Sequence, residues 1–131
     1  MTYSVKLTDV ADIESRPSKN KIYPVGTIII QVSATRGQIL FLHQASEIGE
    51  QYAIIRPKNI DSFYLYSVIE KFFPKFFQQR KQGLNIRSDE LKHFSFPIHK
   101  DKHRQNLIGL IMRKMAGQES FYGGVEKPIG E

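Results

Sequence analysis

The chain has 131 residues, a formal net charge of +6 from 19 Lys and Arg against 13 Asp and Glu, and no cysteine. A chain of this length folds as one domain and buries roughly two thirds of the surface that it exposes when unfolded. The lack of cysteine excludes disulfides and thiolate metal sites. No apolar run approaches the ~20 residues of a membrane helix, and no secretion signal is recognisable at the N-terminus. We therefore expect a soluble, cytoplasmic protein with no membrane partner.

The first half of the chain predicts β structure. Residues 3–7 alternate apolar and polar side chains, which is typical of an edge strand, and Thr8 can cap a helical turn after it. Residues 23–32 contain three consecutive isoleucines, which predict a central strand covered on both faces. Two more strands are expected at 38–43 and 51–56, with a glycine-containing connection between them.

From Asp61 onward the spacing of apolar residues changes to three and four, as in an amphipathic helix, with Asp61 or Ser62 as its N-cap. Pro74 predicts a kink or a break near Phe73, and Gly83 predicts the C-terminal stop. The aromatic side chains of this helix would also suit base stacking. At helical spacing, however, a place in the core is the favoured interpretation.

The last third predicts a short helix from Ser88, an extended segment at 94–98, and a helix from Lys102 to Met115 capped by Asp101. The apolar stripe of that last helix consists of Leu107, Ile108, Ile111, Met112 and Met115. A helix of under four turns needs a partner, so we interpret the stripe as a partner or dimer surface. Residues 1–116 would form the single domain and residues 117–131, with four glycines, a flexible tail.

All of the excess charge lies between Lys71 and Arg104, where nine Lys and Arg stand against three acids. Such a block suits one polyanionic partner, and it also suits a solvated helix face. Arg pairs with guanine edges, Asn and Gln with adenine, and Lys with phosphate. The candidate DNA-contacting residues are Lys19, Lys21, Thr35, Arg36, Arg80, Lys81, Gln82, Asn85 and Arg87.

No motif predicts catalysis. The sequence contains no HExxH, GxSxG, GxGxxG or phosphate-binding glycine loop with lysine. His93, His99 and His103 fall within eleven residues, but they belong to different predicted elements, so we interpret them as exposed side chains and not as metal ligands. We expect no enzymatic activity, no metal and no cofactor.

The order of motifs along residues 5–115 matches a known pattern. It begins with a hydrophobic strand marked by a glycine, a turn that contains a glycine, and an Ala-Ile strand before a helix. A glycine loop, a short helix with a leucine, a strand with a proline and a helix that starts near a glutamine follow. The residues that carry it are Gly26, Gly37, Ala53, Ile54, Gly83, Leu91, Pro97 and Gln105. The chain resembles a target recognition domain of type I restriction-modification specificity subunits.

The resemblance implies an α+β fold with a small mixed or antiparallel sheet, packed helices and a short C-terminal helix. It also implies a non-catalytic subunit that reads half of a bipartite site in double-stranded DNA and presents the DNA to a modification methyltransferase, which flips an adenine. Whole subunits carry two such domains, so a homodimer of this chain would restore two half-sites.

Two other functions remain open. In the first, the chain is an accessory or decoy module that binds a modification enzyme without reading DNA. In the second, it is a small nuclease or RNA-modifying enzyme, which has the least support because no set of carboxylates or histidines carries it.

Overall fold

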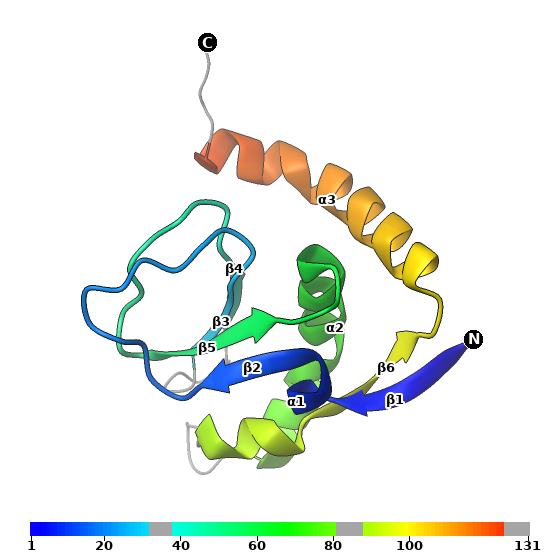
Figure 1. Cartoon of the computed structure of the whole chain (residues 1–131), viewed down its shortest axis with the longest axis horizontal. Helices are drawn as coiled ribbons and strands as arrows, with labels where there is room; N and C mark the ends of the chain where they lie inside the picture. The colour runs from blue at the N-terminus through cyan, green and yellow to red at the C-terminus, as the bar shows by residue number, and fades with distance from the viewer. Residues whose placement is uncertain (32–37, 81–87, 125–131) are drawn as a thin grey trace.

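The structure is a computed structural model that describes residues 1–31, 38–80 and 88–124 (Figure 1). Its elements in chain order are β1 (Thr2–Lys6), α1 (Leu7–Val10), β2 (Ala11–Glu14), β3 (Ile28–Gln31), β4 (Ile39–Phe41), β5 (Tyr52–Pro57), α2 (Ser62–Arg80), the 3₁₀ helix η1 (Ser88–His93), β6 (Ser95–His99) and α3 (Lys102–Gly124). They form a four-stranded sheet and a two-stranded ribbon, with α2 between them (Figure 1). The predicted α+β class is confirmed.

The four-stranded sheet has the order β2-β5-β3-β4, and all neighbouring strands are antiparallel. β3 is internal, so the predicted central strand is confirmed, as are the two predicted strands that follow it. Its side chains alternate between the faces of the sheet. Ile28 and Ile30 pack in the main core with α2, whereas Ile29 pairs with Ile54 on the other face beside Tyr23.

The chain enters β3 through Gly26, which has a φ of +95°. L side chains rarely adopt this conformation, so a glycine is favoured there. A Cβ at this position would also lie 3.1 Å from Ser62 Oγ at the start of α2. The backbone conformation therefore explains why a glycine occupies this position of the sequence pattern.

The ribbon pairs β1 with β6 in antiparallel register, with Val5 opposite Phe96. Both predicted extended segments are thus confirmed. Phe94, Phe96 and Ile98 are buried at the same period-two spacing, and they join the core around α2. The two strands lie far apart in the sequence, and their pairing brings the N-terminus next to the start of α3 (Figure 1).

Helix α2 supplies the centre of the core. Its N-cap is Asp61, as predicted, because the Tyr64 N–H donates to Asp61 Oδ1 at 2.8 Å. The side chains that it buries are Phe63, Tyr64, Leu65, Ile69, Phe73, Phe76 and Phe77. The aromatic residues at helical spacing are therefore core residues, and this confirms the interpretation favoured over base stacking.

The helical turn expected after Thr8 has other bounds. It covers Leu7–Val10, so Thr8 lies inside the turn and does not cap it, and residues 11–14 form strand β2 because they pair with β5. Of the kink or break expected near Phe73, the break does not occur, since α2 continues through Pro74. Proline removes one backbone donor, and the buried rings on both sides of it hold the helix together.

Helix α3 begins at the predicted cap, where the His103 N–H donates to Asp101 Oδ1 at 2.9 Å. It continues beyond the predicted end at Met115 to Gly124, so it is longer than the sequence suggested. It crosses the N-terminal end of α2 at Gly109, where a Cβ would overlap the carboxylate of Asp61. The missing side chain therefore allows the close approach of the two helices.

Hydrogen bonds at His99 join α2, β6 and α3. Tyr64 Oη accepts the His99 N–H at 2.8 Å and lies 2.8 Å from His99 Nδ1, to which its own hydrogen can donate. The backbone carbonyl of His99 accepts a bond from Gln105 Nε2 at 2.6 Å. The corner between β6 and α3 is thus fixed by polar contacts inside the fold.

Replacing Tyr64→Phe should lower the free energy of unfolding by roughly 1–3 kcal/mol, because both His99 groups lose their partner inside the protein. The matched control is Tyr66→Phe, whose hydroxyl bonds the exposed Glu70 carboxylate and whose loss should cost at most about 1 kcal/mol. Urea denaturation of both variants measures the difference. Equal destabilisation would contradict the role assigned to Tyr64.

Candidate nucleic-acid interface

The fold divides the basic stretch 71–104 into two groups. Lys71, Lys75 and Arg80 lie on α2 and Lys92 lies on η1, whereas the cations after β6 lie at the start of α3. The five residues of β6 separate the groups by roughly 15 Å. The basic stretch is therefore not carried by one element, because the extended strand β6 stands between its two parts.

Two lysines of the second group contact other parts of the fold. Lys100 Nζ lies 5.9 Å from the centroid of the Tyr3 ring, and Lys102 Nζ donates to the carbonyl oxygen of Asn59. These contacts fasten the start of α3 to the N-terminus and to the turn before α2. The first group, at the C-terminal end of α2, is the better candidate for contact with a polyanion.

Arg80 joins the end of α2 to η1. Its Nη1 donates to Glu90 Oε1 at 2.9 Å, and its guanidinium lies 5.5 Å from the centroid of the Phe76 ring. The side chain is 44% exposed, so other guanidinium donors still reach solvent. Of the predicted DNA-contacting residues, Arg80 is therefore also a structural one.

Most of the other predicted readers lie outside the described residues. They are Thr35, Arg36, Lys81, Gln82, Asn85 and Arg87, and the predicted stop Gly83 lies there too. The flanking elements are described. The C-terminal end of α2 and the start of η1 lie on one side of the molecule (Figure 1).

Lys19 and Lys21 lie on the loop between β2 and Tyr23. The loop is held by Tyr23 Oη, which donates to Glu14 Oε1 at 2.9 Å and accepts the Ser18 N–H at 3.0 Å. Lys21 Nζ lies 3.9 Å from Glu14 Oε2, which also pairs with Arg56 Nε at 3.1 Å.

Glu14 therefore offsets part of the charge of this loop, and sequence reasoning missed it. Tyr23 was predicted as part of a strand, and its role as the anchor of the loop was missed as well. Both contacts join residues seven and nine positions apart in the sequence, and no local pattern indicates them.

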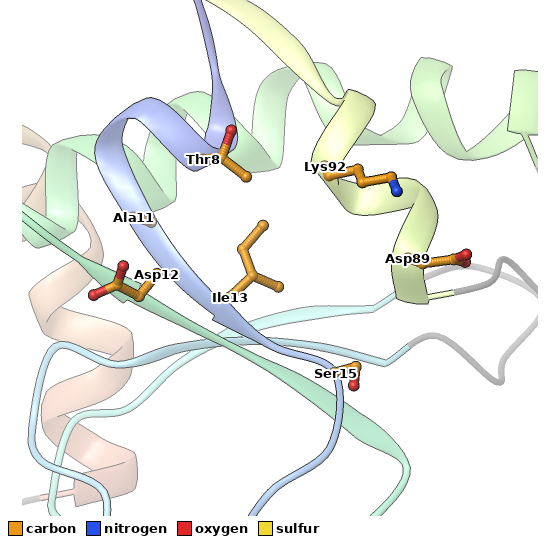
Figure 2. A pocket seen from close by; sticks show the side chains of 7 residues that line it. All are labelled: Thr8, Ala11, Asp12, Ile13, Ser15, Asp89 and Lys92. Carbon is orange, nitrogen blue, oxygen red and sulfur yellow. The ribbon is translucent and has the colours of Figure 1, made fainter.

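A pocket of about 360 Å³ lies between β2 and η1 (Figure 2). Its lining residues are Thr8, Ala11, Asp12, Ile13, Ser15, Asp89 and Lys92. The Ile13 side chain points into the gap between the two elements, while polar groups stand around it (Figure 2). Asp12 Oδ1 also lies 3.4 Å from Lys58 Nζ. None of the lining residues was predicted as a site.

Within the three described ranges, no group of three or more His, Cys, Asp or Glu side chains is placed to hold a metal ion. In the same part of the chain, no helix is both long and apolar enough to cross a bilayer.

The predicted partner stripe on α3 is largely outward-facing. Leu107, Ile111, Met112 and Met115 are 57%, 47%, 37% and 70% exposed, and Leu110, which the prediction omitted, is 49% exposed. Ile108 instead packs against the core. Leu107, Ile108 and Ile111 line a hollow of about 520 Å³ beside Asp101, His103 and Arg104. The apolar face thus has a border of mixed charge.

Arg113 lies on another side of α3 and helps to hold the helix in place. Its guanidinium carbon is 5.2 Å from the centroid of Phe63 and 5.8 Å from that of Phe41. Burial, with the nearby Arg113 charge, lowers the pKa of His43 below its usual value. The ring contacts of Arg113 and the lowered pKa of His43 both result from the packing of α3 near α2 and β4.

No family model matches the chain, and no curated protein matches it. Three solved structures are similar to it. One is the S subunit of a type I restriction-modification system from M. genitalium, with a TM-score of 0.72 and 14% identity. The second comes from work on complex assembly and conformational transition of the type I R-M system, with a TM-score of 0.68 and 18% identity. The third is the HsdS subunit from Thermoanaerobacter tengcongensis, with a TM-score of 0.63 and 18% identity.

The similarity covers 87–89% of this chain and 37–38% of the solved chains. The chain thus spans less than two fifths of the length of these proteins. At such identities the likeness concerns the fold, and it agrees with the order of motifs in the sequence. The chain has the target recognition domain fold of type I restriction-modification specificity subunits.

Proposed function

We propose that this chain is a non-catalytic DNA-specificity module, which reads a half-site of duplex DNA and presents it to a modification methyltransferase. The observation that carries the proposal is the fold shared over 87–89% of the chain with three structures from type I restriction-modification systems, two of which are S subunits. The net charge of +6, concentrated in residues 71–104, supports a polyanionic partner.

The DNA-reading end is the side of the molecule where α2 ends and η1 begins (Figure 1). The segments 32–37 and 81–87 start and finish there and carry most of the candidate readers. Arg36 and Arg87 suit guanine edges, whereas Gln82 and Asn85 suit adenine. The chain supplies recognition only, and the methyltransferase supplies the pocket for the flipped base.

The apolar face of α3 is the partner surface. Helix α3 packs at the start of α2, whereas the DNA-reading end lies where α2 finishes. DNA and a partner can therefore be bound at the same time. A second copy is the simplest occupant, because the chain spans 37–38% of the solved S-subunit chains and two copies would provide two half-sites. A homodimer then offers the methyltransferase a bipartite DNA site.

A second candidate function is an accessory or decoy module that binds a modification enzyme without reading DNA. The exposed apolar side chains on α3, up to 70% exposed at Met115, favour it because large exposed apolar faces mark interaction sites. Binding of duplex DNA distinguishes the two functions.

The wild-type chain should bind duplex DNA with an affinity that falls steeply with salt, with a log–log slope corresponding to several phosphate contacts. Replacing Lys81→Gln and Arg87→Gln together should weaken binding by about tenfold or more, since a good base contact is worth roughly 1–3 kcal/mol. This pair leaves the Arg80–Glu90 bridge intact.

Fluorescence anisotropy at several salt concentrations measures both effects. The control combines Lys100→Gln with Lys114→Gln. Lys100 lies just before α3 and Lys114 lies on α3, so this variant should bind DNA with wild-type affinity. Absence of wild-type binding at low salt would favour the accessory module over the DNA reader.

Light scattering at micromolar concentration should give the mass of two chains for the wild type and of one chain for Ile111→Glu. A carboxylate in an apolar interface costs several kcal/mol unless it is paired, so the dimer should dissociate. The control Asn106→Glu adds the same charge at an exposed polar position of α3 and should remain dimeric. A monomeric wild type would rule out self-association through this face.

A further inference from the structure

The C-terminal half of α2 carries a continuous exposed strip of cations and amides. Lys71, Lys75, Gln78 and Gln79 are all exposed, and they recur at the three- and four-residue spacing of one helix face. The opposite face is fixed in the core by Ile69, Phe73, Phe76 and Phe77. The helix cannot rotate without exposing these side chains, so the strip has a fixed orientation.

We infer that this strip holds the sugar–phosphate backbone of the duplex independently of sequence, while residues 81–87 discriminate between bases. The inference rests on the proposed function and adds a division of labour to it. Lys and Gln side chains are suitable donors to phosphate oxygens, and such contacts position a protein on DNA without reading its sequence.

The charges around the strip support an anionic ligand. Residues 71–80 contain no acid, and the neighbouring Glu70 accepts a hydrogen bond from Tyr66 Oη at 3.0 Å. Among the described residues, Lys71 and Lys75 form no ion pair, whereas Arg80 is partly neutralised by Glu90. Lys71 Nζ does lie 5.4 Å from the Phe72 ring centroid, a contact that keeps its charge.

The length of the strip also fits. From Lys71 to Gln79 the helix rises about 12 Å at ~1.5 Å per residue. Lys71 and Lys75 are about 6 Å apart along the helix axis. Because the DNA strand winds around its axis, neighbouring phosphates lie farther apart than their ~3.4 Å axial rise, so each lysine can face one phosphate of the same strand. The strip ends beside Arg80, the last residue of α2.

The experiment compares Lys71→Gln/Lys75→Gln with Lys81→Gln/Arg87→Gln and with the control Lys100→Gln/Lys114→Gln, each of which removes two positive charges. Thermal denaturation first verifies that all three remain folded. Salt titration of a mixed-sequence duplex then gives affinity and slope. Selection from a random duplex pool, followed by sequencing, gives the base preference of each protein.

For Lys71→Gln/Lys75→Gln we expect the log–log slope to shrink by about 1.8, affinity at 0.1 M salt to fall more than about tenfold, and base preference to stay that of the wild type. Lys81→Gln/Arg87→Gln should change the base preference. The inference would be overturned if Lys71→Gln/Lys75→Gln had the same log–log slope as the control variant, or if it changed the base preference. The proposed DNA-reading function would still stand in either case. A wild type that binds no duplex would overturn both.

Discussion

The buried aromatic face of α2 is the constraint on which the rest of the structure depends. The four-stranded sheet and the β1–β6 ribbon contribute to one core around this helix, so neither sheet has a complete core without it. The N-terminal end of α2 receives α3 at Gly109, and its C-terminal end is joined to η1 by the Arg80–Glu90 pair. A helix of 19 residues, about 28 Å long, therefore sets the distance between the two ends of the domain.

In the proposed function, this arrangement separates DNA recognition from assembly. The C-terminal end of α2 meets the start of η1 at one end of the helix, and α3 crosses the other end at Gly109 (Figure 1). The exposed apolar side chains belong to α3. A recognition module needs such a separation, because its DNA must stay accessible while a partner is bound. The hydrogen bonds of Tyr64 to His99 hold the β6–α3 corner rigidly, so the partner surface has a defined direction relative to α2.

Much of the fold follows from local patterns in the sequence. Three isoleucines predicted β3, helical spacing predicted α2, and the order of motifs predicted the fold class. Strand β2 was missed because Val10 and Ile13 have helical spacing, and only pairing with β5 makes that segment extended. The candidate site was harder to predict. The Arg80–Glu90 and Lys21–Glu14 contacts, and the division of the basic stretch by β6, depend on tertiary structure that charge counting does not contain.

We propose that the end of α2 faces DNA while α3 does not. The most direct test of this claim is an NMR titration of the isotope-labelled chain with a duplex obtained by selection from a random pool. We expect backbone shift changes to concentrate in the second half of α2, in η1 and in the segments beside them, with little change in α3. Changes concentrated on the exposed face of α3, or no changes at all, would contradict the claim.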